Sequence, residues 1–218
     1  MLKHKIVREA YLFGYPLVTM DMTRRHETNV RVPDDAHAPM GQLVKLRAYP
    51  AVDDHGAAAP NADTLYTMAW LDVSAGPWVF SIPGMGDRFY IMPMLSGFNE
   101  VFFVAGSRAT GGKAQEYVIT GPGWSGTLPE GVTQVQSPTA LVWILGRVYC
   151  EGTPEDYAAV HELQDRFSSV PPQRLRDPVY AASGHRGRDV RHGEGDSQAG
   201  QRPSPGRLLH LPRGAAEG

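Results

Sequence analysis

Four polar side chains lie within a short stretch of the sequence: Asn61, Asp63, Thr64 and Tyr66. They precede and begin an alternating series of apolar residues, Thr64 to Val73, that predicts a β-strand. Asn and Asp at the start of such a series favour a turn. We therefore expect these polar groups at the mouth of a strand, where they are held rigidly and can face solvent or a ligand.

A carboxylate beside a phenol and an arginine supports two kinds of chemistry. Asp63 and Tyr66 are candidates for acid–base catalysis. The same groups, with Arg88 or Arg147 as the cation, can instead order a carboxylate, a sugar or a phosphate through charge-assisted hydrogen bonds. A structural interpretation competes with both, in which Asn61 and Asp63 hydrogen-bond to their own turn while Tyr66 packs.

Two groups of site residues follow from this interpretation. The catalytic candidates are Asp63 and Tyr66. The ligand-binding candidates are Asn61, Thr64, Arg88, Arg147 and Trp124, the last as a stacking surface for a sugar or an aromatic ligand.

Composition limits the other kinds of site. The chain has 218 residues, of which 42% are hydrophobic and 20% charged, with a net charge of −2, typical of a soluble domain. Its one cysteine, Cys150, excludes an internal disulfide and a cysteine-rich zinc site. The candidate metal ligands Asp53, Asp54, His55 and Asp63 match no established spacing, so we interpret them as a solvated acidic loop and expect neither a metal nor a cofactor.

The N-terminal segment is predicted to be an amphipathic helix. One face repeats at spacings of four and three, through Ile6, Ala10, Phe13, Leu17 and Met20. Gly14 and Pro16 are expected to kink or split it. No apolar run is long enough to span a bilayer, and no signal-peptide cleavage site appears. The chain as it stands is therefore expected in the cytoplasm.

The middle of the chain predicts an α+β fold with a mainly antiparallel, sandwich- or barrel-like sheet. Strands are expected at 78–82, 88–95, 100–104, 117–120, 132–135 and 140–149. The turn Pro83–Asp87 predicts a hairpin between the first two. A closing helix is expected after Thr153 as N-cap and Pro154 in the first turn.

Several ordered motifs identify a family resemblance over residues 5–170. They include Pro60–Tyr66 (PNADTLY), Arg88–Met94 (RFYIMPM), Thr120–Trp124 (TGPGW) and Trp143–Arg147 (WILGR). Together they resemble the bacterial family called domain of unknown function 1254. Relatives typically add an exported N-terminus and a second domain, domain of unknown function 1214, which implies that this chain is truncated and that its relatives are periplasmic or secreted. The resemblance implies an α+β domain and no established reaction.

Residues 171–218 differ in character from the rest. Eight arginines follow Val170, among glycines and prolines, and no lysine occurs beyond Lys113. A basic arm for nucleic acid is one interpretation. We favour another, a disordered tail translated out of frame, because one extra C near Pro171 would convert a family-like phrase into the observed residues. No nucleic-acid partner is therefore expected.

Two functional classes remain. The first is a structural or binding module of a two-domain envelope protein that holds a small polar or glycan-like ligand. The second is part of a hydrolase-like enzyme with Asp63 as base and an arginine that stabilises negative charge. A surface that the missing domain would cover is expected to be apolar and to favour self-association.

Overall fold

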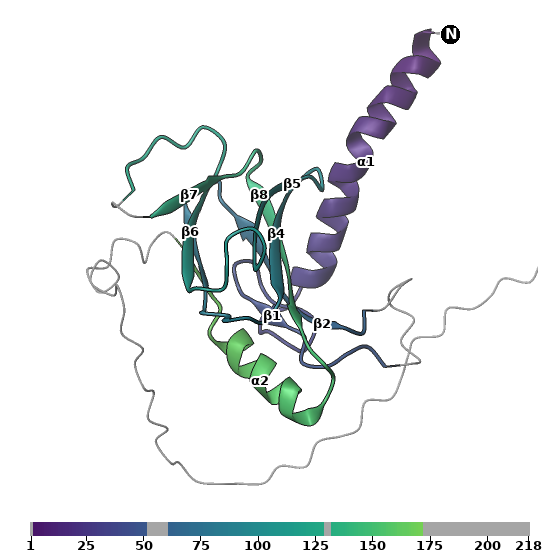
Figure 1. The fold of residues 1–218 in the computed structure, drawn as a ribbon. Coiled ribbons are helices and arrows are strands. Elements are labelled where there is room, and N and C mark those ends of the chain that lie inside the picture. Colours follow the sequence, from purple (N-terminus) through teal and green to yellow (C-terminus); the bar gives the residue numbers. More distant parts are fainter. Residues whose placement is uncertain (1, 52–60, 129–131, 172–218) are drawn as a thin grey trace, which may run out of the picture. The chain divides into compact units, whose positions relative to one another are not determined.

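The computed structural model describes residues 2–51, 61–128 and 132–171 (Figure 1). The chain divides into two compact units, Met1–Ser183 and Gly184–Gly218, and the second lies wholly outside the described residues. The prediction of a disordered, out-of-frame tail concerns residues 171–218, of which 172–218 also lie outside the described residues. The elements are α1 (Leu2–Thr28), β1 (Val44–Lys45), β2 (Thr64–Asp72), β3 (Trp78–Ile82), β4 (Tyr90–Ser96), β5 (Val101–Gly106), β6 (Gln115–Thr120), β7 (Thr133–Gln136), β8 (Leu141–Tyr149), α2 (Pro154–Asp165) and β9 (Ser168–Val170).

The strands form two mainly antiparallel sheets, which confirms the predicted α+β class. One sheet has five strands in the order β1-β2-β8-β4-β5, and the other has four in the order β7-β6-β3-β9. Only the pairing of β6 with β7 is parallel within the described residues. The sheets do not close on themselves, so the barrel-like alternative is wrong.

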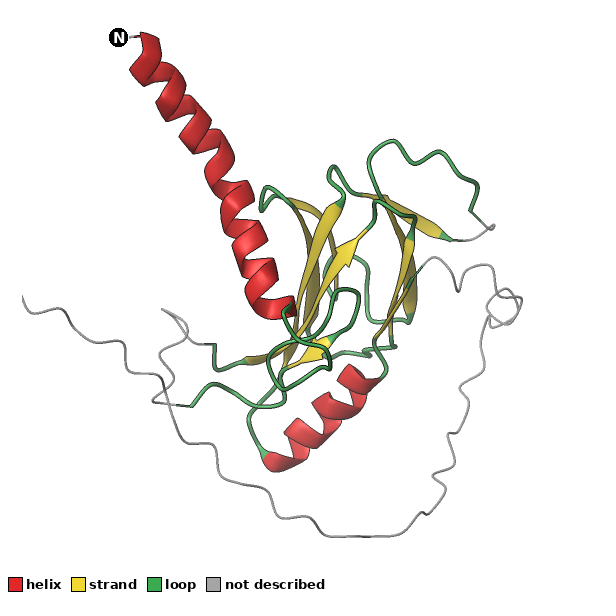
Figure 2. Ribbon diagram, turned by 180° about the vertical axis from the view of Figure 1, so that it is seen from behind, coloured by secondary structure: helices red, strands yellow, loops and turns green. Residues whose placement is uncertain are grey.

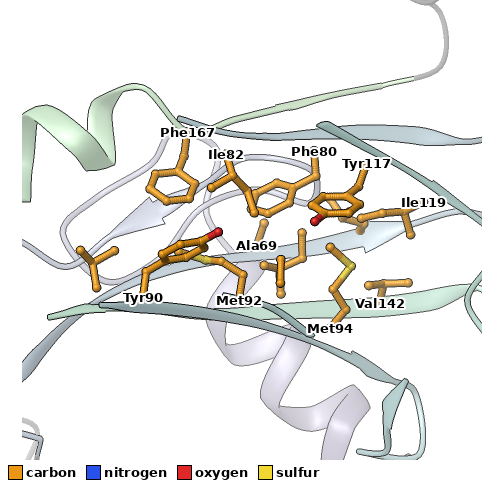
Figure 3. Packing of buried hydrophobic residues seen from close by; sticks show 14 of the residues in the cluster. Ala69, Phe80, Ile82, Tyr90, Met92, Met94, Tyr117, Ile119, Val142 and Phe167 are labelled. Atoms are coloured by element: carbon orange, nitrogen blue, oxygen red, sulfur yellow. The ribbon is translucent and has the colours of Figure 1, made fainter. Parts of the chain in front are cut away.

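The main hydrophobic core takes side chains from both sheets. In β2, alternate residues such as Leu65 and Leu71 are almost completely buried, because successive side chains of a strand point to opposite faces. Phe80 of β3 and Met92 of β4 belong to the same core cluster (Figure 3). The residues of β2 between the core positions, Tyr66 among them, therefore belong to the other face of the sheet.

The predicted hairpin at Pro83–Asp87 is wrong. β3 pairs with β6 and β9, whereas β4 pairs with β5 and β8, so the two strands that flank this turn belong to different sheets. Hydrogen bonds from Met85 and Gly86 to the carbonyl of Gly112 hold the turn against a distant loop. These long-range contacts, which a turn signal does not encode, carry the chain from one sheet to the other.

α1 is one uninterrupted helix, so the expected split at Gly14 and Pro16 does not occur (Figure 2). Pro16 removes one intrahelical hydrogen bond, to the carbonyl of Leu12. Because Leu12 is 62% exposed, water can hydrate that carbonyl. No helix in the described part of the chain is both long and apolar enough to cross a membrane.

One face of α1 contacts the β-sheet body. The ring of Phe13 lies 5.4 Å from that of Phe98, and Met20 is 3% exposed. Near the end of the helix, Glu27 accepts a hydrogen bond of 2.6 Å from the indole of Trp70. The periodicity that predicted this face is confirmed for its C-terminal half.

The predicted closing helix is also confirmed as α2. Thr153 caps it by accepting a hydrogen bond from the backbone N–H of Asp156. On its buried side, the Gln164 amide donates to the carbonyls of Leu46 and Tyr66 and to the hydroxyl of Thr67. These bonds fasten α2 to β2.

The ladder between β4 and β8 pauses at Met92 and Pro93. Ile91 pairs with Arg147 before the pause and Met94 with Ile144 after it, in the same register. Pro93 has no backbone N–H to donate, and proline is rare in inner strands for that reason. Gly146 lies opposite the pause, where an added Cβ would meet the carbonyl oxygen of Thr67 at 2.6 Å.

Candidate functional site

Three strands of the larger sheet bring an aromatic, a cationic and an aliphatic residue side by side. Tyr66 of β2 pairs with Arg147 of β8, which pairs in turn with Ile91 of β4. Their neighbours Leu65 and Val148 are in the core, so alternation places all three on the opposite face. The register of the sheet therefore builds the centre of the site.

Arg147 lies over the ring of Tyr66. Its guanidinium carbon is 5.1 Å from the ring centroid, within the range of a cation–π interaction. Both side chains are half-buried. The Nε atom of Arg147 is buried and has no hydrogen-bond partner among the described residues.

Asn61 organises the loop that leads into β2. Its Oδ1 accepts hydrogen bonds from the backbone N–H groups of Asp63, at 2.9 Å, and Thr64, at 3.2 Å, and its amide donates to the hydroxyl of Thr64. The structural interpretation therefore describes Asn61 and Thr64 well, because their polar groups bond within the loop.

Asp63 is held by its backbone, and its side chain is exposed. Its carbonyl accepts a hydrogen bond of 3.0 Å from the N–H of Cys150, which joins the loop to the end of β8. The described residues provide no hydrogen-bond partner for the Asp63 carboxylate. The Asp63 carboxylate is therefore an exposed group on a fixed backbone.

These residues line one open depression of about 460 Å³. Its lining consists of Asn61, Asp63, Thr64, Tyr66, Phe89, Ile91 and Arg147. The structure thus brings together five of the seven predicted site residues. The depression offers one anion, one cation and an aromatic wall.

Arg88 is placed elsewhere. It donates to the carboxylate of Asp156 at 2.5 and 3.0 Å and to the carbonyl of Tyr149 at 2.8 Å. The hydrogen bond from Arg88 lowers the pKa of Asp156 to about 2. Arg88 lines a neighbouring hollow that shares only Phe89 with the depression, and its charge is already paired.

Trp124 also lies apart from the depression. It lines another hollow, of about 880 Å³, which residues of Val73–Pro77 and of Gly121–Leu128 form together with Ala140. No charged side chain is among the residues that line that hollow. Gly126 lies against the Trp124 indole, because an added Cβ there would be 2.4 Å from the ring.

Sequence reasoning missed Phe89 and Ile91. The sequence predicts a strand that includes both residues but does not show which face of the sheet each side chain occupies. Phe89 is 38% exposed, and Ile91 lies beside Arg147. The alternation of Tyr90, Met92 and Met94 into the core is the signal that could have placed Ile91 on the outer face.

No group of three potential metal ligands occurs in residues 2–51, 61–128 and 132–171. Asp53, Asp54 and His55, interpreted above as an acidic loop, lie outside these ranges. The polar side chains that line the depression carry one carboxylate, one phenol, one guanidinium, one amide and one aliphatic hydroxyl.

Comparison with known proteins supports the family resemblance. The family model "Protein of unknown function (DUF1254)" matches residues 40–171. The chain belongs to the DUF1254 family. The matched DUF1254 segment contains every residue that lines the depression. No curated protein matches the chain.

A solved structure of a longer protein has a fold similar to that of this chain. The VPA0106 protein from Vibrio parahaemolyticus aligns with a TM-score of 0.62 and 22% identity, over 85% of this chain and 41% of that one. This chain therefore spans less than half the length of that protein, and the likeness concerns the fold alone. An uncharacterized protein from Burkholderia cenocepacia aligns with a TM-score of 0.31 and 9% identity, over 47% of this chain and 31% of that one.

Proposed function

We propose that this chain is a binding module for a small ligand that carries both a carboxylate and hydroxyl groups, such as an acidic sugar. The observation that supports it is the position of Arg147, over Tyr66 and at the wall of the depression. A guanidinium is planar and binds carboxylates through paired hydrogen bonds. The exposed Asp63 carboxylate accepts hydrogen bonds from hydroxyl groups of the same ligand.

The surrounding residues suit this class of ligand. Tyr66 and Phe89 offer aromatic surface to the apolar face of a sugar ring, while Ile91 gives the depression an apolar wall. The two charges of opposite sign disfavour a ligand that is anionic throughout, because Asp63 would repel one end of it. A molecule with one anionic end and a neutral hydroxylated body satisfies both.

Calorimetric titration of the full chain with D-glucuronate tests the proposal. D-glucose lacks the carboxylate and acetate lacks the hydroxyls, so each is expected to bind more weakly than glucuronate. Arg147→Gln is expected to lower the affinity about tenfold, which corresponds to about 1.4 kcal/mol. The exposed Arg31, changed to Gln, is the matched control.

Equal binding of glucose and glucuronate would exclude a role for the cation. Binding that Arg147→Gln and Asp63→Asn both leave unchanged would place the ligand elsewhere. The exposed Asp35, changed to Asn, controls for the loss of a surface carboxylate.

The hydrolase-like alternative retains one of its two candidate cations, because Asp63 and Arg147 share the depression with Tyr66. It predicts turnover of a nitrophenyl glucuronide that Asp63→Asn abolishes. The binding module predicts no turnover and only a modest loss of affinity in the same variant. The two functions are therefore separated by one substitution and two measurements.

A further inference from the structure

α1 exposes an unusual amount of apolar surface. Of the 13 large hydrophobic residues that are exposed in the described part of the chain, eight lie on this helix. They are Ile6, Val7, Tyr11, Leu12, Phe13, Tyr15, Val18 and Met22, and each is between 55% and 68% exposed. Contiguous exposed apolar surface of this kind marks an interaction site.

Five of these residues form a narrow stripe, which we call the outer seam: Val7, Tyr11, Tyr15, Val18 and Met22. Their spacings are four, four, three and four, the pattern by which one helix packs along another. The rings of Tyr11 and Tyr15 follow one another along it, 5.5 Å apart.

Most of the outer seam lies on the side of α1 opposite to the β-sheet body, and only Tyr15 also borders a small hollow with Met20 and Asn99. Phe13 and Met20, which contact the body, each follow a seam residue by two positions, about 200° around the helix. One face of α1 is therefore already packed against its own chain. The seam is a second face, available to a separate partner.

We propose that the outer seam pairs with the outer seam of a second copy of this chain, antiparallel and about a two-fold axis. A two-fold interface uses the same surface on both copies, and this seam is complementary to itself. With the centre of the pair between Gly14 and Tyr15, Val7 faces Met22 and Tyr11 faces Val18. Gly14 lies opposite Tyr15, and an added Cβ at Gly14 would meet nothing within 4 Å, so room exists for that ring.

Charge favours the antiparallel arrangement. Lys3, Lys5 and Arg8 gather at the start of α1, where Glu9 is the one acidic side chain, and it is paired with Lys5. A parallel pair would bring these cations together. The antiparallel register instead places them opposite the end of α1, where Asp21 and Glu27 offset the charges of Arg24 and Arg25.

The available area suits a small interface. A whole aromatic side chain offers about 150–250 Å², so roughly 100 Å² from each of the five outer-seam residues gives on the order of 500 Å² per copy. The total of about 1,000 Å² lies at the lower end of the range for specific interfaces.

Sedimentation velocity of the full chain over about 1–100 μM tests the pairing. We expect a dimer with a dissociation constant in the micromolar range or tighter. Tyr11→Lys and Val18→Glu are each expected to weaken it at least tenfold. Thr19→Lys, at the exposed neighbour of Val18, is the matched control and is expected to leave the dimer intact.

A mixture of the two variants tests the register. Tyr11→Lys and Val18→Glu face each other in the mixed dimer, while the other contact of this pair is unchanged, so mixing is expected to restore association. A monomer throughout the concentration range, or dimers that both variants leave intact, would overturn the proposal. Failure of the mixture to associate would overturn the antiparallel register. Circular dichroism of each variant checks that α1 is folded, as expected for substitutions at exposed helical positions.

Discussion

Arg147 and Tyr66 occupy directly opposed positions on neighbouring antiparallel strands, and the guanidinium carbon of Arg147 is 5.1 Å from the centroid of the Tyr66 ring. The pair is a product of register. A shift of β8 by one residue relative to β2 would place Arg147 and Tyr66 on opposite faces of the sheet. The candidate site therefore depends on the pairing of the two longest strands, of nine residues each.

The first prediction concerns this pair. In a double-mutant cycle with Tyr66→Leu and Arg147→Gln, we expect a coupling of about 0.5–1 kcal/mol, the usual value of a cation–π contact that is partly exposed. Urea denaturation of the four proteins measures it. Arg108 and Phe89, 5.7 Å apart and both exposed, form the comparison pair and should couple less. Additive effects of Tyr66→Leu and Arg147→Gln would contradict the interaction.

The second prediction follows from the lowered pKa of Asp156, which the hydrogen bond from Arg88 moves from 3.8 to about 2. A carboxyl with a lowered pKa in the folded state stabilises the fold above its unfolded pKa, and this contribution is lost as the pH falls. The window is therefore about pH 4 to 2. The contribution is about 2 kcal/mol at neutral pH, since the Asp156 side chain is only 14% exposed.

Asp156→Asn is expected to lower the free energy of unfolding by about that amount at pH 7 and to flatten its fall between pH 4 and 2. Acid and urea titrations of both proteins check this. Glu155→Gln, at the exposed neighbouring position, serves as the control. A steep fall that persists in the Asn variant would show that other carboxyls are responsible.

The third prediction concerns Glu27, whose pKa is shifted in the opposite direction from that of Asp156. Burial raises the pKa of Glu27 above its ordinary 4.5, against the hydrogen bond from Trp70, which lowers it. A carboxyl with a raised pKa contributes most to stability at low pH and loses that contribution as the pH rises through the raised pKa. Glu27→Gln keeps an acceptor for the indole and removes the charge. The melting temperature of the Glu27→Gln variant, relative to that of the wild type, should therefore rise as the pH increases from about 4 to 7. Glu9→Gln, at an exposed position, is the control.

The fourth prediction concerns the buried amide of Gln164. Its nitrogen serves three acceptors, on Leu46, Tyr66 and Thr67. Gln164→Leu leaves these groups without their donor and is expected to cost about 2–3 kcal/mol. Glu162→Leu, at an exposed position of α2, should change the free energy of unfolding by less than about 0.5 kcal/mol. Similar losses in both variants would contradict the role of the amide.

Local patterns in the sequence predicted most of the elements. The alternation from Thr64 onward marks β2, and Thr153 with Pro154 marks the start of α2, because strand alternation and helix capping depend on neighbouring residues alone. The partners of the strands depend on distant residues. The residues Pro83–Asp87 predict a hairpin turn. In the structure, hydrogen bonds to Gly112 hold this turn against a distant loop, and the two flanking strands belong to different sheets.

The candidate site was predictable to the same extent. The polar cluster at Asn61–Tyr66 could be predicted because turn residues precede a strand. Which of the two arginines joins the cluster could not be predicted from local sequence. The sequence alone does not distinguish Arg88 from Arg147 as the cation of the site. In the structure, the pairing of β2 with β8 places Arg147 beside Tyr66, whereas Arg88 is hydrogen-bonded to Asp156. Asn61 behaves as a turn residue, so only part of the polar cluster is available for binding.

The pause in the β4–β8 ladder at Met92 and Pro93 allows binding near Arg147 to be detected by hydrogen exchange. Pro93 has no backbone N–H, and the strand pairing is interrupted beside the Ile91–Arg147 pair. Amide deuterium uptake at Leu145, which lies opposite Pro93 and whose N–H faces β4, should therefore be faster than at Trp143, which is paired with Leu95 of β4, because local opening needs fewer bonds to break. A molecule seated against Arg147 would slow that uptake, so occupancy of the depression can be followed by isotope exchange, without knowledge of any reaction.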